Sequence, residues 1–184
     1  MRGYFGIGVE RVSNPMNVGS LFRTAHAFGA SFVFSVAGAY NRHEGGYADT
    51  SSAVRNLPLH EFENAGALAL PRDCALVAVE LDEDAVELPS FRHPRCAAYV
   101  FGAERGGLSV ELLELAEHVV RIPTCFSVNL AVAGAIVMYD RLLSSGRFAG
   151  RPVVPGGPVE PVEPHEFGDP VWARKARRRA ADKD

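Results

Sequence analysis

Apolar residues recur along the first 145 residues of the chain with two spacings, one typical of strands and one typical of helices. Short alternating or continuous apolar runs predict strands, and apolar residues three or four positions apart predict helices. Because the two kinds of element alternate, the pattern favours an α/β fold, a mostly parallel sheet flanked by helices. The predicted strands cover residues 4–12, 31–36, 57–62, 74–81, 97–101 and 118–122, and the predicted helices cover residues 15–28, 64–70, 110–117 and 127–142.

The last of these helices, residues 127–142, has an unusual composition. Its apolar residues lie on nearly every side of the helix, from Val128 and Leu130 to Val137 and Met138. A helix without a polar face has to bury both sides. We therefore expect this helix to lie in a core or in a subunit interface.

Two polar segments interrupt the pattern. Residues 38–56 are polar and glycine-rich, which predicts a long loop with one turn of helix at residues 50–55, and loops of this length are often functional. Residues 150–170 hold six of the twelve prolines, typical of a stiff linker, and residues 171–181 form a basic segment that could be helical. We expect one domain over residues 1–148, followed by a proline-rich linker and basic tail over residues 149–184.

Composition narrows the class of protein. The net charge of −3 argues against a nonspecific electrostatic binder of nucleic acids. No apolar run approaches the ~20 residues needed to span a bilayer, and the N-terminal apolar run is too short for a signal peptide. Cys74, Cys96 and Cys125 lack the spacing of a zinc site or a disulfide framework, and the histidines show no ligand spacing. We expect a cytoplasmic protein with no membrane segment and no metal.

The stretch AAYVFGAERGGLS, residues 97–109, offers the first candidate site. A buried strand ends at Phe101 and gives way to Gly102, Gly106 and Gly107 before Ser109 opens a helix. Glycine lets a ligand approach the backbone closely, and open α/β sheets bind ligands at the carboxyl ends of their strands. A tight turn without any ligand is the ordinary alternative.

Two further stretches strengthen the functional interpretation. Residues 14–30 read NPMNVGSLFRTAHAFGA, and residues 121–142 read RIPTCFSVNLAVAGAIVMYDRL. Together with residues 97–109, they resemble in order and content the signature blocks of the SPOUT methyltransferases, and in particular their TrmH (SpoU) branch. The resemblance implies transfer of a methyl group from S-adenosylmethionine to a ribose 2′-hydroxyl in tRNA or rRNA.

The same resemblance has consequences for fold and assembly. It implies that residues ~100–142 form a C-terminal trefoil knot around the methyl donor, a feature that periodicity does not reveal and that is nearly absent from other proteins. It also implies a homodimer packed through the first helix and the last helix. RNA contact would then come from the dimer surface, residues 38–56 and the basic tail, although a tail that only aids solubility is equally consistent with the sequence.

The resemblance also assigns residues to the chemistry. Arg23 matches the family's key catalytic group, and Asn17, Glu104, Ser127 and Asn129 match residues that arrange the site. A guanidinium is a poor base, so Arg23 would either hold a phosphate bidentately or stabilise a developing alkoxide. The residue types also allow structural roles: Arg23 as a surface residue near a helix end, and the asparagines and the serine as helix caps.

The methyl donor would be held by the backbone on both sides of the predicted site. The resemblance implies donor-binding roles for residues in the second and third blocks, namely Phe101, Gly102, Ala103, Gly107, Ile122, Pro123, Ser127 and Val128. The chain departs from the family in two places. Ala103 stands where an amide residue is common, and only Thr124, Cys125 and Phe126 separate Pro123 from Ser127.

Other functions remain open on the sequence. One is a catalytically inactive knotted protein that binds RNA or assists assembly, and another is an enzyme of the same fold that methylates a base. A base-modifying enzyme needs acid and base groups around a flipped base. A nucleotide-binding enzyme of another class is less favoured, because no glycine-rich loop follows the first strand.

Overall fold

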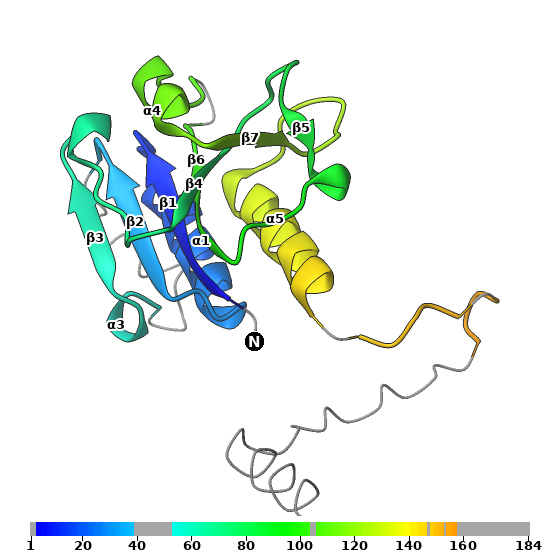
Figure 1. Ribbon diagram of the computed structural model, residues 1–184. Helices are drawn as coiled ribbons and strands as arrows, with labels where there is room; N and C mark the ends of the chain where they lie inside the picture. The colour runs from blue at the N-terminus through cyan, green and yellow to red at the C-terminus, as the bar shows by residue number, and fades with distance from the viewer. Residues whose placement is uncertain (1–2, 39–52, 104–105, 147, 153, 158–184) are drawn as a thin grey trace, which may run out of the picture. The chain divides into compact units, whose positions relative to one another are not determined.

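The computed structural model describes residues 3–38, 53–103, 106–146, 148–152 and 154–157 (Figure 1). The chain divides into two compact units, Met1–Gly146 and Arg147–Asp184. In the second unit the described residues include a turn in which the Gly157 amide donates to the Val154 carbonyl at 2.9 Å. The basic segment predicted at residues 171–181 and most of the loop predicted at residues 38–56 lie outside the described residues.

The first unit is a parallel α/β sheet with helices on both faces, as the sequence predicts. Each pair of neighbouring strands is parallel, and the strand order is β3-β2-β1-β6-β4-β7-β5 (Figure 1). The strands are β1 (Tyr4–Glu10), β2 (Phe32–Val36), β3 (Leu59–Phe62), β4 (Ala75–Val79), β5 (Val86–Glu87), β6 (Cys96–Phe101) and β7 (His118–Arg121). The helices are α1 (Pro15–Ala27), α3 (Ala53–Asn56), α4 (Val110–Leu115) and α5 (Leu130–Ser145), with 3₁₀ turns at Ala65–Ala67 and Leu88–Ser90.

Three details differ from the sequence prediction. The predicted helix over residues 64–70 is a single 3₁₀ turn, because Asn64 caps it and the backbone is already extended at Leu68. The short strand β5 gives no apolar run of its own and was not predicted. Helix α5 begins at Leu130 instead of residue 127, since the Asn129 side chain accepts a hydrogen bond from the Ala131 amide and sets the start of the helix.

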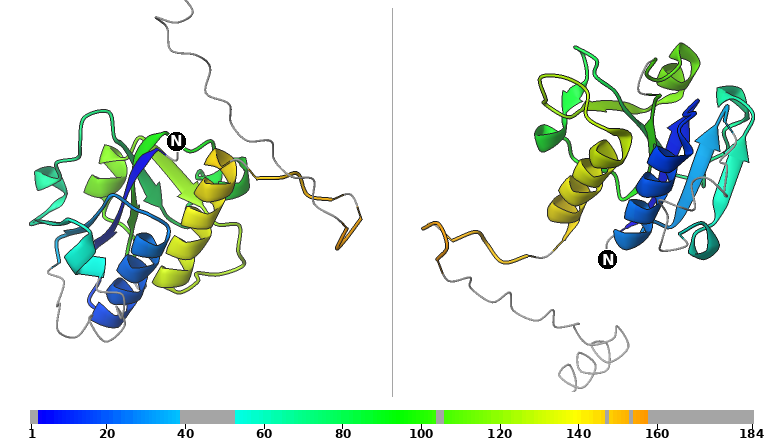
Figure 2. Two further views of the ribbon diagram at one scale, coloured as in Figure 1. Left: turned by 90° about the horizontal axis from the view of Figure 1, so that it is seen from below. Right: turned by 180° about the vertical axis from the view of Figure 1, so that it is seen from behind.

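Helices α1 and α5 lie side by side on one face of the sheet, as both views in Figure 2 show. They can approach closely because Gly134 of α5 has no side chain. A Cβ at this position would lie only 2.1 Å from Leu21 of α1. Helix α4 and the turn at Ala65–Ala67 cover the other face. Both α1 and α5 follow a strand, so both begin at the edge of the sheet where the strands end.

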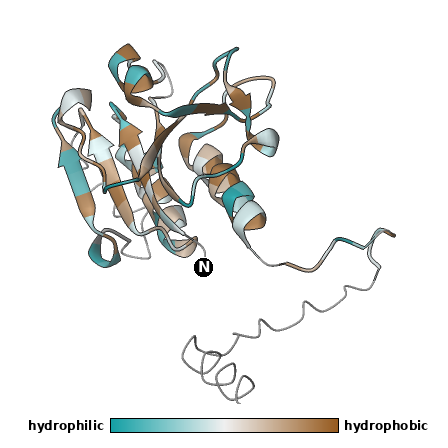
Figure 3. Cartoon of the chain, viewed as in Figure 1, coloured by the Kyte–Doolittle hydropathy of each residue, from teal (hydrophilic) through white to brown (hydrophobic). Residues whose placement is uncertain are grey.

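A buried arginine of α5 forms hydrogen bonds at the end of the sheet where the strands begin. Arg141 is only 3% exposed and lies near the C-terminal end of α5, which has a hydrophilic band in this half (Figure 3). Its guanidinium donates to the carbonyls of Pro94 and Arg95 at 2.6 and 2.9 Å and to the Tyr99 hydroxyl at 3.1 Å. It also lies over the ring of Phe5, 5.1 Å from the centroid.

The hydrogen bonds of Tyr99 continue to His93 and Asp140. Burial raises the pKa of Tyr99 to about 12, so its phenol keeps its proton. The phenol oxygen accepts from Arg141, and its proton is therefore available to His93 Nδ1, 2.6 Å away. His93 Nε2 then donates to Asp140 at 2.9 Å. This direction requires a neutral imidazole, in agreement with a pKa of His93 that burial lowers from 6.5 although Asp140 opposes the shift.

We predict that His93 makes the protein less stable in mild acid. The unfolded chain protonates His93 as the pH falls through about 6.5, whereas the folded protein does so only at lower pH. The protonation of His93 therefore leaves the free energy of unfolding unchanged above pH ~6.5. Below that pH it lowers the free energy of unfolding, by up to about 1.4 kcal/mol per pH unit. Urea unfolding between pH 7.5 and 5.0 should show a smaller pH dependence for His93→Gln. The exposed His60, changed to Gln, is the control, and an equal dependence in both variants would contradict the assignment.

Candidate active site

A pocket of about 310 Å³ lies where β4, β6 and β7 end and α5 begins. It is large enough for a small organic ligand or cofactor, since such sites usually measure ~300–1,000 Å³. Its walls are mainly apolar side chains and loop backbone. The lining residues are Val79, Glu80, Leu81, Phe101, Gly102, Ala103, Gly107, Ile122, Thr124, Ser127, Val128, Leu130 and Ala133.

The glycine loop after β6 forms one wall, and its shape depends on glycine at two positions. The Gly107 amide donates to the Ala103 carbonyl at 2.9 Å, which folds the loop back on itself. Gly107 has a φ of +60°, in the left-handed region that favours glycine. A Cβ at Gly102 would lie 2.2 Å from the Gly107 carbonyl carbon. Both glycines are therefore needed for the close approach of the two arms of the loop.

Two carboxylates hold this loop on the ends of two strands. Glu10, the last residue of β1, is 2% exposed and accepts from the Ser109 amide at 2.6 Å and from the Ser109 hydroxyl at 2.5 Å. Glu80 follows β4 and accepts from the Leu108 amide at 2.8 Å. The sequence analysis did not identify either glutamate. A signal was present, because each one directly ends a short apolar strand, GIGVE and LVAVE.

The segment between β7 and α5 forms the facing wall. Ile122, Ser127 and Val128 line the pocket, whereas Pro123 is exposed and is not among the described side chains that line it. The short connection is held by Thr124, whose hydroxyl donates to the Phe126 carbonyl at 2.9 Å. Thr124 therefore belongs to the pocket, although the sequence analysis assigned it no role.

The structure brings together seven of the eight residues for which donor-binding roles were predicted. Pro123 is the exception, and the roles themselves stay predictions. Of the predicted catalytic residues, Asn17 and Asn129 meet across the starts of α1 and α5, where the Asn129 amide group donates to Asn17 Oδ1 at 3.1 Å. Neither capping alternative holds for Asn17 or Ser127, because Asn14 caps α1 and Asn129 caps α5. Glu104 lies outside the described residues.

Arg23 lies apart from the pocket lining. It is exposed on α1, seven residues after Met16, which is 44% exposed. Seven residues are about two helical turns, so both side chains lie on one face of α1. Across the residues described here, no helix is long and apolar enough to cross a membrane, and no cluster of three or more His, Cys, Asp or Glu side chains could hold a metal.

Comparison with protein families and relatives places this geometry in context. A family model described as the SpoU rRNA Methylase family matches residues 5–139. A tRNA (guanosine(18)-2′-O)-methyltransferase of Thermus thermophilus is 29% identical over 140 residues, which cover 72% of this chain and 71% of that protein. A second relative of the same name, from Escherichia coli, is 28% identical, and the match covers 72% of this chain and 60% of the relative.

Solved structures agree with the sequence comparison. An AdoMet-bound rRNA methyltransferase from Sinorhizobium meliloti superposes with a TM-score of 0.69 at 26% identity, covering 78% of this chain and 57% of that one. A structure described as concerning the 2-OH methylation of C/U34 on tRNA superposes with a TM-score of 0.68 at 22% identity. The match covers 78% of this chain and 97% of that one and shows the fold alone.

We predict that Glu80 holds the glycine loop closed. Glu80→Ala removes the acceptor of the buried Leu108 amide, and an unsatisfied buried donor costs ~1–3 kcal/mol. The Leu108 amide should exchange its hydrogen faster by at least tenfold, as measured by NMR. Glu80→Gln keeps an acceptor oxygen and should show a smaller effect. The exposed Glu83, changed to Ala, is the control; unchanged exchange in Glu80→Ala would show that the carboxylate does not hold the loop.

Proposed function

This chain belongs to the SpoU rRNA Methylase family, and from that membership we infer that it transfers a methyl group from S-adenosylmethionine to a ribose 2′-hydroxyl of RNA. The observation that carries the inference is the pocket at the ends of β4, β6 and β7, walled by the glycine loop and by residues 122–128. Relatives carry names with tRNA and with rRNA as substrates, so the RNA class stays open.

The pocket fits S-adenosylmethionine by its size and by the character of its walls. Val79, Ile122 and Leu130 offer apolar surface for the flat adenine ring. The loop backbone at Gly102 and Gly107 offers polar groups without side chains in the way. Glu80 offers carboxylate oxygens, which can accept more hydrogen bonds than the loop uses. We propose that these residues, with Phe101, Ala103, Ser127 and Val128, hold the donor.

The chemistry that the donor supplies when bound is an electrophilic methyl group on a sulfonium that leaves as a neutral thioether. The protein has to align the ribose oxygen with this methyl group and stabilise the charge that develops as the hydroxyl loses its proton. Alignment alone can lower the barrier by ~7–11 kcal/mol in favourable cases. We propose that Asn17 and Asn129, joined at 3.1 Å, fix the entrance at which the ribose lies.

Arg23 is proposed as the main catalytic group. A guanidinium stays charged at neutral pH and does not act as a base. It can donate two parallel hydrogen bonds to a phosphate next to the ribose, or it can stabilise the oxygen as it becomes an alkoxide. Glu104 and Ser127 are proposed to arrange the site around it.

We further propose a homodimer packed through α1 and α5. The support is a set of exposed apolar side chains on these two helices, Met16, Val132, Tyr139 and Leu143, which are 39–52% exposed. Arg23 lies on the same face of α1 as Met16 and would therefore face the subunit interface. The site would then be completed where two subunits meet.

Two finer features of the family complete the proposal. A trefoil knot is supported by the topology, since β7 lies between β4 and β5 while the chain after β7 returns to α5, beside α1. A cytoplasmic location is proposed because tRNA and rRNA are the substrates that the similar proteins are named for.

We predict that Arg23→Ala loses methyl transfer while S-adenosylmethionine still binds. The rate should fall by ~10²–10³, the usual effect of removing one group that stabilises the transition state. The measurement is transfer of labelled methyl groups to unmodified tRNA or rRNA, with nucleoside mass spectrometry, and donor binding by calorimetry. Arg72→Ala, which removes another exposed arginine, is the control.

The products of this experiment separate the alternatives. A 2′-O-methylated nucleoside that is absent with Arg23→Ala supports the proposal. A methylated base would identify a base-modifying enzyme. Absence of both transfer and donor binding would indicate an inactive RNA-binding protein.

We predict that Tyr139→Glu separates the dimer. A charge placed on an apolar interface loses its hydration when the subunits associate, which weakens association. Light scattering after size exclusion should give the mass of one chain for this variant and of two chains for the wild type. Leu115→Glu, on α4, places the same charge at a side chain of similar exposure, 51% against 52%, and should remain dimeric. A monomeric wild type would exclude the dimer.

A further inference from the structure

A second pocket, of about 250 Å³, lies at the opposite end of the strands, where β1 and β6 begin and α5 ends. Helix α5 has 16 residues, so its two ends are ~24 Å apart, and the two pockets lie beside opposite ends. The residues that line the second pocket are Gly3, Arg92, His93, Pro94, Arg95, Arg141, Ser144 and Ser145. None of them has a role in the proposed methyl transfer.

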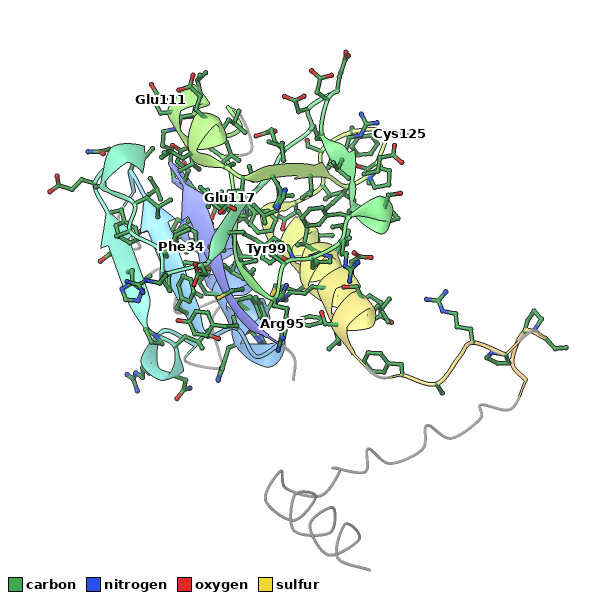
Figure 4. All side chains as sticks on the ribbon, in the orientation of Figure 1. Phe34, Arg95, Tyr99, Glu111, Glu117 and Cys125 are labelled. Carbon is green, nitrogen blue, oxygen red and sulfur yellow. The ribbon has the colours of Figure 1, made fainter. Side chains whose placement is uncertain are left out.

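The lining is strongly positive. Arg92 and Arg95 are exposed, and Arg141, which is 3% exposed, contributes to the wall of the pocket from α5. Figure 4 labels Arg95 and Tyr99, two of the residues that contact the Arg141 guanidinium. No acidic side chain is among the described residues that line the pocket. The nearby carboxylate of Asp140 is hydrogen-bonded to His93.

The buried charge of Arg141 is compensated only in part. Its described hydrogen bonds go to the carbonyls of Pro94 and Arg95 and to the neutral hydroxyl of Tyr99, and its Nε has no partner among the described residues. A buried cation usually has an ionised partner, because desolvation of a lone charge is costly. An anion in the adjoining pocket would supply that partner.

The serines and the histidine of the pocket are already engaged, which limits the contacts available to a ligand. Ser144 and Ser145 donate to the Arg141 carbonyl at 3.0 and 2.5 Å, and both ring nitrogens of His93 are bonded to Tyr99 and Asp140. Recognition of an anion therefore depends on the three arginines. Guanidinium groups bind phosphate with paired hydrogen bonds, and several can share one phosphate group.

We propose that this pocket binds a phosphate group, and that its source is a backbone phosphate of the substrate RNA away from the methylated ribose. The second half rests on the proposed function, since it takes RNA as the substrate. The pocket would give this acidic protein, with a net charge of −3, a local positive site for RNA at a distance from the methyl-transfer pocket.

The test compares the full-length wild type with the double variant Arg92→Ala/Arg95→Ala and with Arg72→Ala. Arg92 and Arg95 are exposed, so the double variant should fold. The buried Arg141 is left unchanged. Inorganic phosphate is titrated while the amide NMR signals of His93 and Ser144, which line the pocket, are followed. RNA binding is measured from 50 to 200 mM salt, and S-adenosylmethionine binding is measured separately.

We expect phosphate to shift these signals in the wild type and in Arg72→Ala but not in the double variant. RNA affinity of the double variant should fall about tenfold, and the slope of log K against log salt should decrease by roughly one for each lost phosphate contact. Donor binding should stay unchanged.

Other outcomes separate the two halves of the proposal. Phosphate shifts without any change in RNA affinity would keep the phosphate site and reject RNA as its source. No phosphate shifts, with RNA affinity and salt slope equal to those of Arg72→Ala, would overturn the proposal. A protein that binds phosphate in this pocket but transfers no methyl group would reject the proposed function and leave the phosphate site standing.

Discussion

The site depends on two carboxylates that hold a loop by its backbone. Glu10 is the last residue of β1, and Glu80 directly follows β4. Their carboxylates accept hydrogen bonds from two successive backbone amides, those of Ser109 and Leu108 respectively. Backbone amides after a glycine loop would otherwise need water or a partner. Because the two acceptors belong to strands on either side of β6, the loop is fixed over the strand ends and forms a stable wall for the pocket.

The facing wall of the pocket is formed at the same end of the strands. All the strands run in parallel, so the segments that leave β4, β6 and β7 meet at one edge, and α1 and α5 both begin there. The close contact of Gly134 with Leu21 keeps the two helices together, and this brings Asn17 and Asn129 into hydrogen-bond distance. Helix packing beside the pocket thus brings these two polar side chains together.

Much of the fold could be predicted because apolar spacing reports burial directly. All the strands except β5, and helices α1, α4 and α5, follow from it, whereas the loop after β6 follows from its glycines. The family resemblance added seven of the pocket residues between Phe101 and Val128. What spacing does not report is the partner of a polar residue. Glu10 and Arg141 are buried, and Glu80 is half-buried, only because they meet amides, carbonyls and rings from distant parts of the chain. Likewise, the start of α5 depends on whether Ser127 or Asn129 turns its side chain to the backbone.

The packing of β1 against β2 links the sizes of residues that are far apart in the sequence. A Cβ at Gly6 would lie 2.2 Å from the Phe32 ring, and one at Gly8 would lie 2.3 Å from the Phe34 ring. The rings thus occupy space that side chains of β1 would otherwise fill. In homologous sequences, a larger residue at either glycine position should therefore occur together with a smaller one at the matching phenylalanine, as a compensated exchange within a constant core volume.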